Sequence, residues 1–129
     1  MPKPAPRISK GSQYTAELKA SAPRATTRGA GDVLFRVFWG RHRGRVLLTF
    51  NFGGINHQSV VLVTASEGDG GNTTNSPQRF VGAANIRVEN IAPTDGRVVF
   101  VVSVDWGSPL ALWTDIVIVA GFPQGFIRA

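Results

Sequence analysis

From Asp32 onward, apolar side chains recur at every second position over most of the chain. Such alternation is typical of β-strands, because successive side chains of a strand point to opposite faces. It predicts six strands, at 32–39, 45–52, 58–65, 80–91, 97–106 and 111–120. Segments rich in Gly, Pro and Asn separate them, and 93–96 has the composition of a tight turn. The pattern therefore predicts an all-β fold, a six-stranded antiparallel β-sandwich over residues 32–129.

Residues 1–31 have a different composition. They contain four prolines, many small residues and few large apolar ones. Such a segment buries too little surface to offset the entropy lost on ordering, so we expect a disordered or extended arm. Tyr14 and Leu18 are its candidates for anchoring on a neighbouring element.

Positive charge is concentrated at the front of the chain. The net charge is +6, and residues 1–31 carry six Lys or Arg against the single acidic Glu17. Four more arginines follow by residue 45, three of them close to Trp39. Such residues can bind phosphates or an acidic surface, or can form a solvated tail, a soluble turn or an intersubunit strap. The candidates for contact with nucleic acid or an acidic surface are Lys3, Arg7, Lys10, Arg41, Arg43 and Arg45.

The last two predicted strands are apolar on both faces. Val99 and Val101 in the fifth, and Trp113 in the sixth, lie opposite a face that is already apolar. A sheet with one face in water should alternate cleanly. The pattern therefore predicts a second burial, either a subunit interface or a cover formed by the arm or a loop.

The residue types argue against a thiol site, a metal site and a catalytic site. The chain has no cysteine, and its two histidines, His42 and His57, have no carboxylates at ligand spacing. Asp105 and Asp115 flank the connection between the last two strands and could meet across a hairpin, although turn and edge roles are commoner. We expect no enzyme, no cofactor and no metal. With no apolar run of about 18 residues and no secretory signal, we expect cytoplasmic synthesis without membrane insertion, and residence there or in a virion.

A rim of polar and aromatic side chains is the best candidate for small-molecule recognition. Trp106 ends the fifth strand beside Asp105, and Asn85 and Arg87 share one face of the fourth strand. An aromatic face can stack on a sugar ring while amide, carboxylate and guanidinium groups bind its hydroxyls. Trp106 could equally be a core or interface anchor, and that role fits Trp39 and Trp113 better.

The segment 45–122 resembles an H-type lectin domain and related sandwich domains at the ends of phage tail fibres. The resemblance rests on TFNF at 49–52, SVVLV at 59–63, RVENI at 87–91 and the closing stretch 98–121. It implies a six-stranded antiparallel sandwich, a homotrimer and binding of N-acetylgalactosamine-type sugars near subunit contacts. It also implies ligand-binding roles for Arg87 and Trp106. The chain differs in having no cysteine, in having Gly107 where a polar side chain would help, and in its basic arm.

Three functions stay open from the sequence. The first is a non-enzymatic oligomeric recognition domain, a trimer by the resemblance, that binds carbohydrate near Arg87 and Trp106. The second is a structural component of a virus or phage particle, such as a capsid, decoration or tail protein, whose arm straps subunits or contacts nucleic acid. The third is a nucleic-acid-binding protein, for which binding should weaken steeply with salt.

Overall fold

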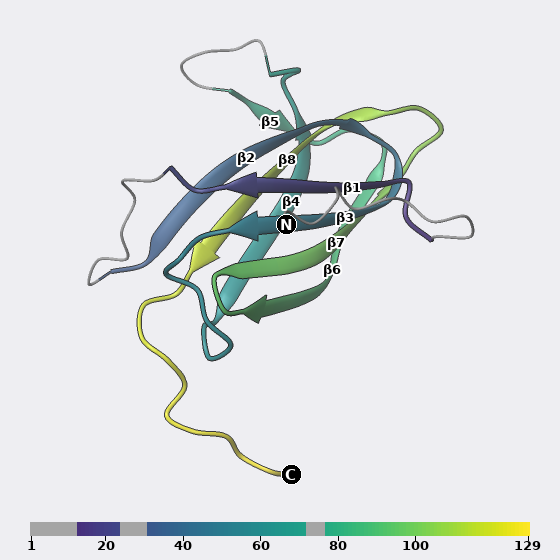
Figure 1. Cartoon of the computed structure of the whole chain (residues 1–129). Helices are drawn as coiled ribbons and strands as arrows, with labels where there is room; N and C mark the ends of the chain where they lie inside the picture. The colour runs from purple at the N-terminus through teal and green to yellow at the C-terminus, as the bar shows by residue number, and fades with distance from the viewer. Residues whose placement is uncertain (1–12, 24–30, 72–76) are drawn as a thin grey trace, which may run out of the picture.

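The computed structural model describes residues 13–23, 31–71 and 77–129. In this part of the chain the fold is all-β, with eight strands and no helix. They form sheet A, in the order β1-β3-β7-β6, and sheet B, in the order β2-β8-β4-β5 (Figure 1). The predicted all-β sandwich is confirmed, whereas the predicted number of six strands is wrong. The strands are β1 (Ala16–Ser21), β2 (Val33–His42), β3 (Gly44–Asn51), β4 (Val61–Gly68), β5 (Arg79–Phe80), β6 (Asn85–Thr94), β7 (Arg97–Asp105) and β8 (Leu110–Ile118).

Strand β1 lies within the segment predicted as an arm. It runs parallel to β3, and the backbone N–H of Thr15 donates to Arg45 O at 2.8 Å just before it begins. Leu18 packs against the core, and the Tyr14 ring lies 5.4 Å from the Arg45 guanidinium carbon, so both predicted anchors are used. The inward positions of β1 beside Leu18 are alanines, which explains why the apolar alternation was too weak to predict a strand.

The predicted strand 80–91 is two strands. Residues 81–84 separate the two-residue β5, which pairs with β4, from β6, which pairs with β7. Gly82 falls in this break. β6 itself is irregular between Glu89 and Ala92, where Asn90 adopts a positive φ of 55°. Asparagine tolerates this left-handed conformation better than most residues, which suits it to a bulge.

Two connections expected to be hairpins cross from one sheet to the other. Strands β2 and β3 are separated only by Arg43, yet they belong to sheets B and A. Gly40 and Gly44 flank this corner with φ of 89° and 75°, values that strain other residues. β7 and β8 also lie in different sheets. Asp105 and Asp115 therefore belong to different sheets, so the connection between them is not a hairpin across which the two carboxylates could meet.

The core lies between the inner faces of the two sheets. β3 and β7 contribute Leu48, Phe50 and Phe100 from sheet A. Trp39 enters from β2, packs edge-on against Phe100 with ring centroids 6.3 Å apart, and donates from Nε1 to Thr114 Oγ1 at 2.8 Å. The buried indole N–H thus has a partner, which removes the cost of leaving it unsatisfied. The core role expected for Trp39 is confirmed.

Candidate functional site

The outer face of sheet A carries charged side chains at its centre. Strand register aligns Arg45 of β3, Ser103 of β7 and Arg87 of β6 in one row. Glu89 lies in the adjacent row, opposite Val101. Because every second residue of a strand points to the same face, all four side chains project from one surface.

These side chains form a polar network around Glu89. Arg45 Nη2 lies 2.9 Å from Glu89 Oε2, and Ser103 Oγ donates to Glu89 Oε1 at 2.7 Å. Arg87 Nη2 is farther away, at 3.7 Å from Oε1. The Ser103 hydroxyl and the Arg45 guanidinium stabilise the charged carboxylate, so the pKa of Glu89 falls below its ordinary value of 4.5.

A shallow pocket of about 330 Å³ opens over this network. Asp105 lies at its edge, and its carboxylate makes no hydrogen bond or ion pair with another side chain in the described part of the molecule. Arg87 is exposed and only loosely paired, so it too has donors available to a ligand. The pocket is lined by Gly44, Arg45, Arg87, Glu89, Ser103, Val104 and Asp105.

The structure brings together part of the predicted carbohydrate rim. Arg87 and Asp105 line the pocket, and Asn85 lies directly opposite Asp105 in the strand register. Trp106 follows Asp105 and is 45% exposed, but it does not line the pocket. Its backbone N–H donates to Val104 O at 3.2 Å as the chain leaves β7.

Two pocket residues, Glu89 and Ser103, were not predicted from the sequence. Glu89 shares a strand face with Arg87, and Ser103 shares one with Asp105, so period-two alternation could have found both. Arg45, which also lines the pocket, was predicted as a contact with nucleic acid and not as part of this site. Alternation along the chain does not show that β3 and β6 both pair with β7, and this pairing is what brings Arg45, Glu89 and Ser103 together.

The predicted nucleic-acid residues have separate surroundings. Arg45 belongs to the outer face of sheet A, whereas Arg43 Nη1 donates to Gly107 O at 2.8 Å across the sheet corner. Arg41 lies near Gly70, on the side of sheet B. The three arginines contact different elements. Lys3, Arg7 and Lys10 lie outside the described residues.

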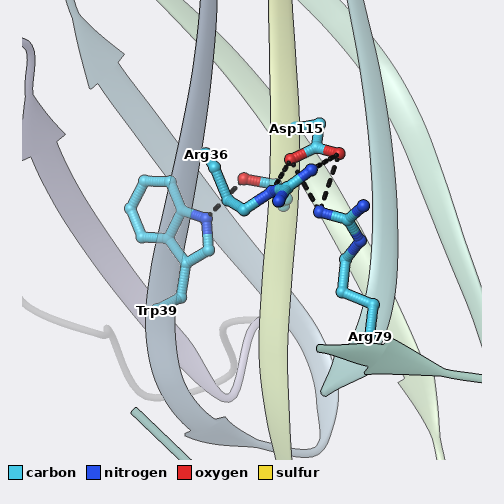
Figure 2. A network of polar contacts seen from close by, with 5 residues as sticks. Arg36, Trp39, Arg79 and Asp115 are labelled. Atoms are coloured by element: carbon cyan, nitrogen blue, oxygen red, sulfur yellow. Dashed lines mark hydrogen bonds and ion pairs between the residues drawn. The ribbon is translucent and has the colours of Figure 1, made fainter. Parts of the chain in front are cut away.

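A second polar network lies on the outer face of sheet B. Asp115 of β8 accepts from Arg36 Nε at 2.7 Å and from Arg79 Nη1 at 3.2 Å (Figure 2). The hydrogen bond to Asp115 raises the pKa of the Arg36 guanidinium above its ordinary value. A carboxylate of the interior strand β8, held between guanidinium groups from β2 and β5, acts as a cross-strand tie, which is a structural role.

The histidines do not form a metal or catalytic cluster. His57 Nδ1 lies 3.4 Å from Asp95 Oδ1 with both side chains exposed, and His42 Nε2 contacts Trp39 O at 2.7 Å. Within residues 13–23, 31–71 and 77–129, no three His, Cys, Asp or Glu side chains gather where they could hold a metal ion. The same residues contain no helix that could cross a membrane.

Comparison of the chain with protein-family models, with curated proteins and with solved structures finds no match. The function therefore has to be argued from the pocket and from the surfaces of the two sheets.

Proposed function

We propose that the protein is a non-enzymatic, oligomeric recognition domain that binds carbohydrate in the pocket on the outer face of sheet A. One observation carries the proposal. Arg87 and Asp105, both expected to bind sugar, line the same exposed pocket although they come from different strands. The resemblance to H-type lectin domains, which implies a six-stranded antiparallel sandwich, supports the same function. Six of the eight strands form two antiparallel sets, β2-β8-β4 and β3-β7-β6.

The pocket has the chemistry that sugar hydroxyls need. A hydroxyl both donates and accepts, so it is bound best between a carboxylate and a guanidinium. Asp105 would accept from the sugar, and Arg87 would donate to it. Glu89 is held by Arg45 and Ser103, which keeps the surrounding network rigid before the ligand arrives.

Trp106 and Asn85 would contact a sugar that extends past the pocket. The Arg43 guanidinium donates to Gly107 O at 2.8 Å and so holds the backbone next to Trp106. An exposed indole such as that of Trp106 can stack on the apolar face of a sugar ring. Asn85, in register with Asp105, adds an amide that both donates and accepts.

A second candidate function is a structural component of a virus or phage particle. The observation that favours it is the segment after β8, in which Phe126 and Ile127 are almost wholly exposed. Large apolar side chains in water usually mark a surface that another molecule covers. In this function the basic residues ahead of β1 would strap subunits or contact nucleic acid.

A glycan array probed with purified protein and two arginine variants tests the first function. Arg87→Ala should lower glycan retention about tenfold or more, because it removes a charged hydrogen-bond donor. Arg97→Ala is the matched control, since Arg97 is also exposed but lies at the opposite end of β7 from Asp105. Equal retention by both variants, or no glycan bound by the unchanged protein, would reject the proposed site. A very large, nucleic-acid-rich species in light scattering would favour the particle function.

A further inference from the structure

The outer face of sheet B leaves an apolar row in solvent. Leu34 of β2, Val117 of β8 and Leu62 of β4 lie directly opposite one another in the strand register. Leu34 is 68% exposed and Leu62 is 54% exposed, with the half-buried Val117 between them. Three adjacent strands therefore present apolar side chains in one line without a charge between them.

A second exposed apolar feature, the segment after β8, begins next to this row. β8 ends at Ile118, one residue after Val117, and the chain continues as the segment 119–129 without further strands. This segment has no charged side chain before Arg128. Its side chains of Phe126 and Ile127 are 83% and 97% exposed.

The start of the segment is fixed on sheet B. The backbone N–H of Ala120 donates to Asp32 Oδ1 at 2.6 Å, and that of Val119 donates to Val60 O at 3.0 Å. The chain then passes the loop 57–60, where a groove of about 370 Å³ includes Phe126 in its lining. Figure 1 shows its end lying away from both sheets. The exposed row of the same subunit therefore stays uncovered by its own segment.

We propose that residues 122–128 of one copy lie across the Leu34–Val117–Leu62 row of a second copy. Residues 122–127 and the row carry no charged side chain, so their contact removes exposed apolar area without desolvating a charge, and Arg128 lies at the end of the segment, where it can stay in water. The row spans three strands, or about 10 Å. An extended segment of this length reaches about 23 Å. It is therefore long enough to leave its own subunit and cross the row of another.

The position of the two features also explains how copies can close into a finite assembly. Because the segment starts at the end of β8 that carries the row, each subunit gives its segment and receives another at the same end of sheet B. Two copies can exchange segments mutually, or each can pass its segment to the next around a ring. The contact supplies an interface for the oligomer included in the proposed function and is independent of the ligand in the pocket.

Disulfide trapping tests the contact directly, because the chain has no cysteine of its own. A Leu62→Cys preparation is mixed with a Phe126→Cys preparation under mild oxidation. We expect a covalent heterodimer in excess of either homodimer. Val81→Cys replaces Leu62→Cys in the control, since Val81 is fully exposed but lies in the break between β5 and β6. Equal yields with both partners, or no heterodimer, overturn the proposal.

Light scattering on a chain ending at Gly121 separates this contact from oligomerisation in general. We expect the truncated chain, and Leu34→Ser with Leu62→Ser, to fall to monomer mass with an unchanged circular-dichroism spectrum, whereas Val81→Ser keeps the full mass. If the truncated chain stays oligomeric, this contact is wrong but the proposed oligomeric function stands. If the unchanged chain is a monomer, both are wrong, and glycan binding is judged by the array alone. If removing residues 1–12 disperses the assembly and truncation does not, the basic arm is the strap and the proposal fails.

Discussion

Strand β7 of sheet A and strand β8 of sheet B are both apolar on both sides, but their outward apolar side chains are covered in different ways. On sheet A, Val101 is only 3% exposed between its cross-strand partners Leu47 and Glu89, and charged side chains surround it. On sheet B the face is divided. One end is covered by residues 69–71, which follow β4, and the other end holds the exposed Leu34 and Leu62.

The covered end of sheet B is built around Trp113. Its ring packs on Phe38 with centroids 4.8 Å apart, and its Nε1 donates to Asp69 O at 2.7 Å. A loop is thus the cover at this end, one of the two alternatives that the sequence left open. At the other end nothing in the described part of the chain plays this role for Leu34. The comparison teaches that a strand with apolar side chains on both faces, such as β8, can have its outer face covered by its own chain along only part of its length.

The largest expected effect separates the two ends of sheet B. Trp113→Ala removes a buried ring and its hydrogen bond, and should lower the free energy of unfolding by about 3–5 kcal/mol. Leu34→Ala, on the same face, should change it by about 0.5 kcal/mol or less because the side chain is already in water. Urea denaturation at a protein concentration low enough to give monomers measures both. Equal losses would mean that Leu34 is covered within its own subunit.

The next effect tests the loop cover without removing an aromatic ring. A Cβ added at Gly68 would lie 2.6 Å from Gln78 O and 2.7 Å from Trp113 Cδ1. Gly68→Ala should therefore cost about 1–3 kcal/mol through overpacking. Gly107→Ala is the control, because nothing lies within 4 Å of its added Cβ. Thermal unfolding of the two variants gives the difference, and a stable Gly68→Ala would show that the loop moves away freely.

A smaller effect concerns the cross-strand tie at Asp115, which lies on β8 between Trp113 at one end of sheet B and Val117 at the other. Asp115→Asn leaves Arg36 and Arg79 facing each other without a carboxylate, and should cost about 1 kcal/mol because all three side chains keep some contact with water. Asp95→Asn, which affects only the exposed pair with His57, should cost almost nothing. Urea titrations in low and high salt compare them. An equal cost for both would mean that the network of Figure 2 contributes no more than a surface pair.

Period-two alternation was sufficient for the fold class, but not for the number of strands, because it missed β1 and read β5 and β6 as one strand. It could not give the partners of each strand, because a short connection such as Arg43 reads as a hairpin turn whether its strands pair or cross between sheets. This is why the sequence left open a meeting of Asp105 and Asp115 across a hairpin. β1 was missed because alanines occupy its inward positions beside Leu18, so the pairing with β3 outweighs a weak local signal.

The candidate site was predictable only in part for the same reason. Arg87 was chosen from strand position and from the resemblance, Asp105 from its place beside Trp106 at the end of a strand, and both line the pocket. Glu89 and Ser103 were missed. Alternation puts each of them on the same strand face as a chosen residue, but it does not show the Ser103–Glu89 contact across β6 and β7 that makes them part of the site. Trp106, chosen as an exposed aromatic, is exposed but does not line the pocket.

The smallest expected effect tests whether the network on sheet A is held by charge. The folded-state pKa of Glu89 lies below its ordinary value of 4.5, so its stabilising contribution is complete above about pH 4.5 and is lost as the pH falls through the lowered pKa. Glu89→Gln should therefore lower the melting temperature modestly at neutral pH and much less at acidic pH. Glu17→Gln, on the outer face of β1 with no ion pair among the described residues, should show no such convergence. Melting curves across this pH range decide the matter, since a gap between wild type and Glu89→Gln that does not shrink in acid would mean that the carboxylate acts through its shape alone.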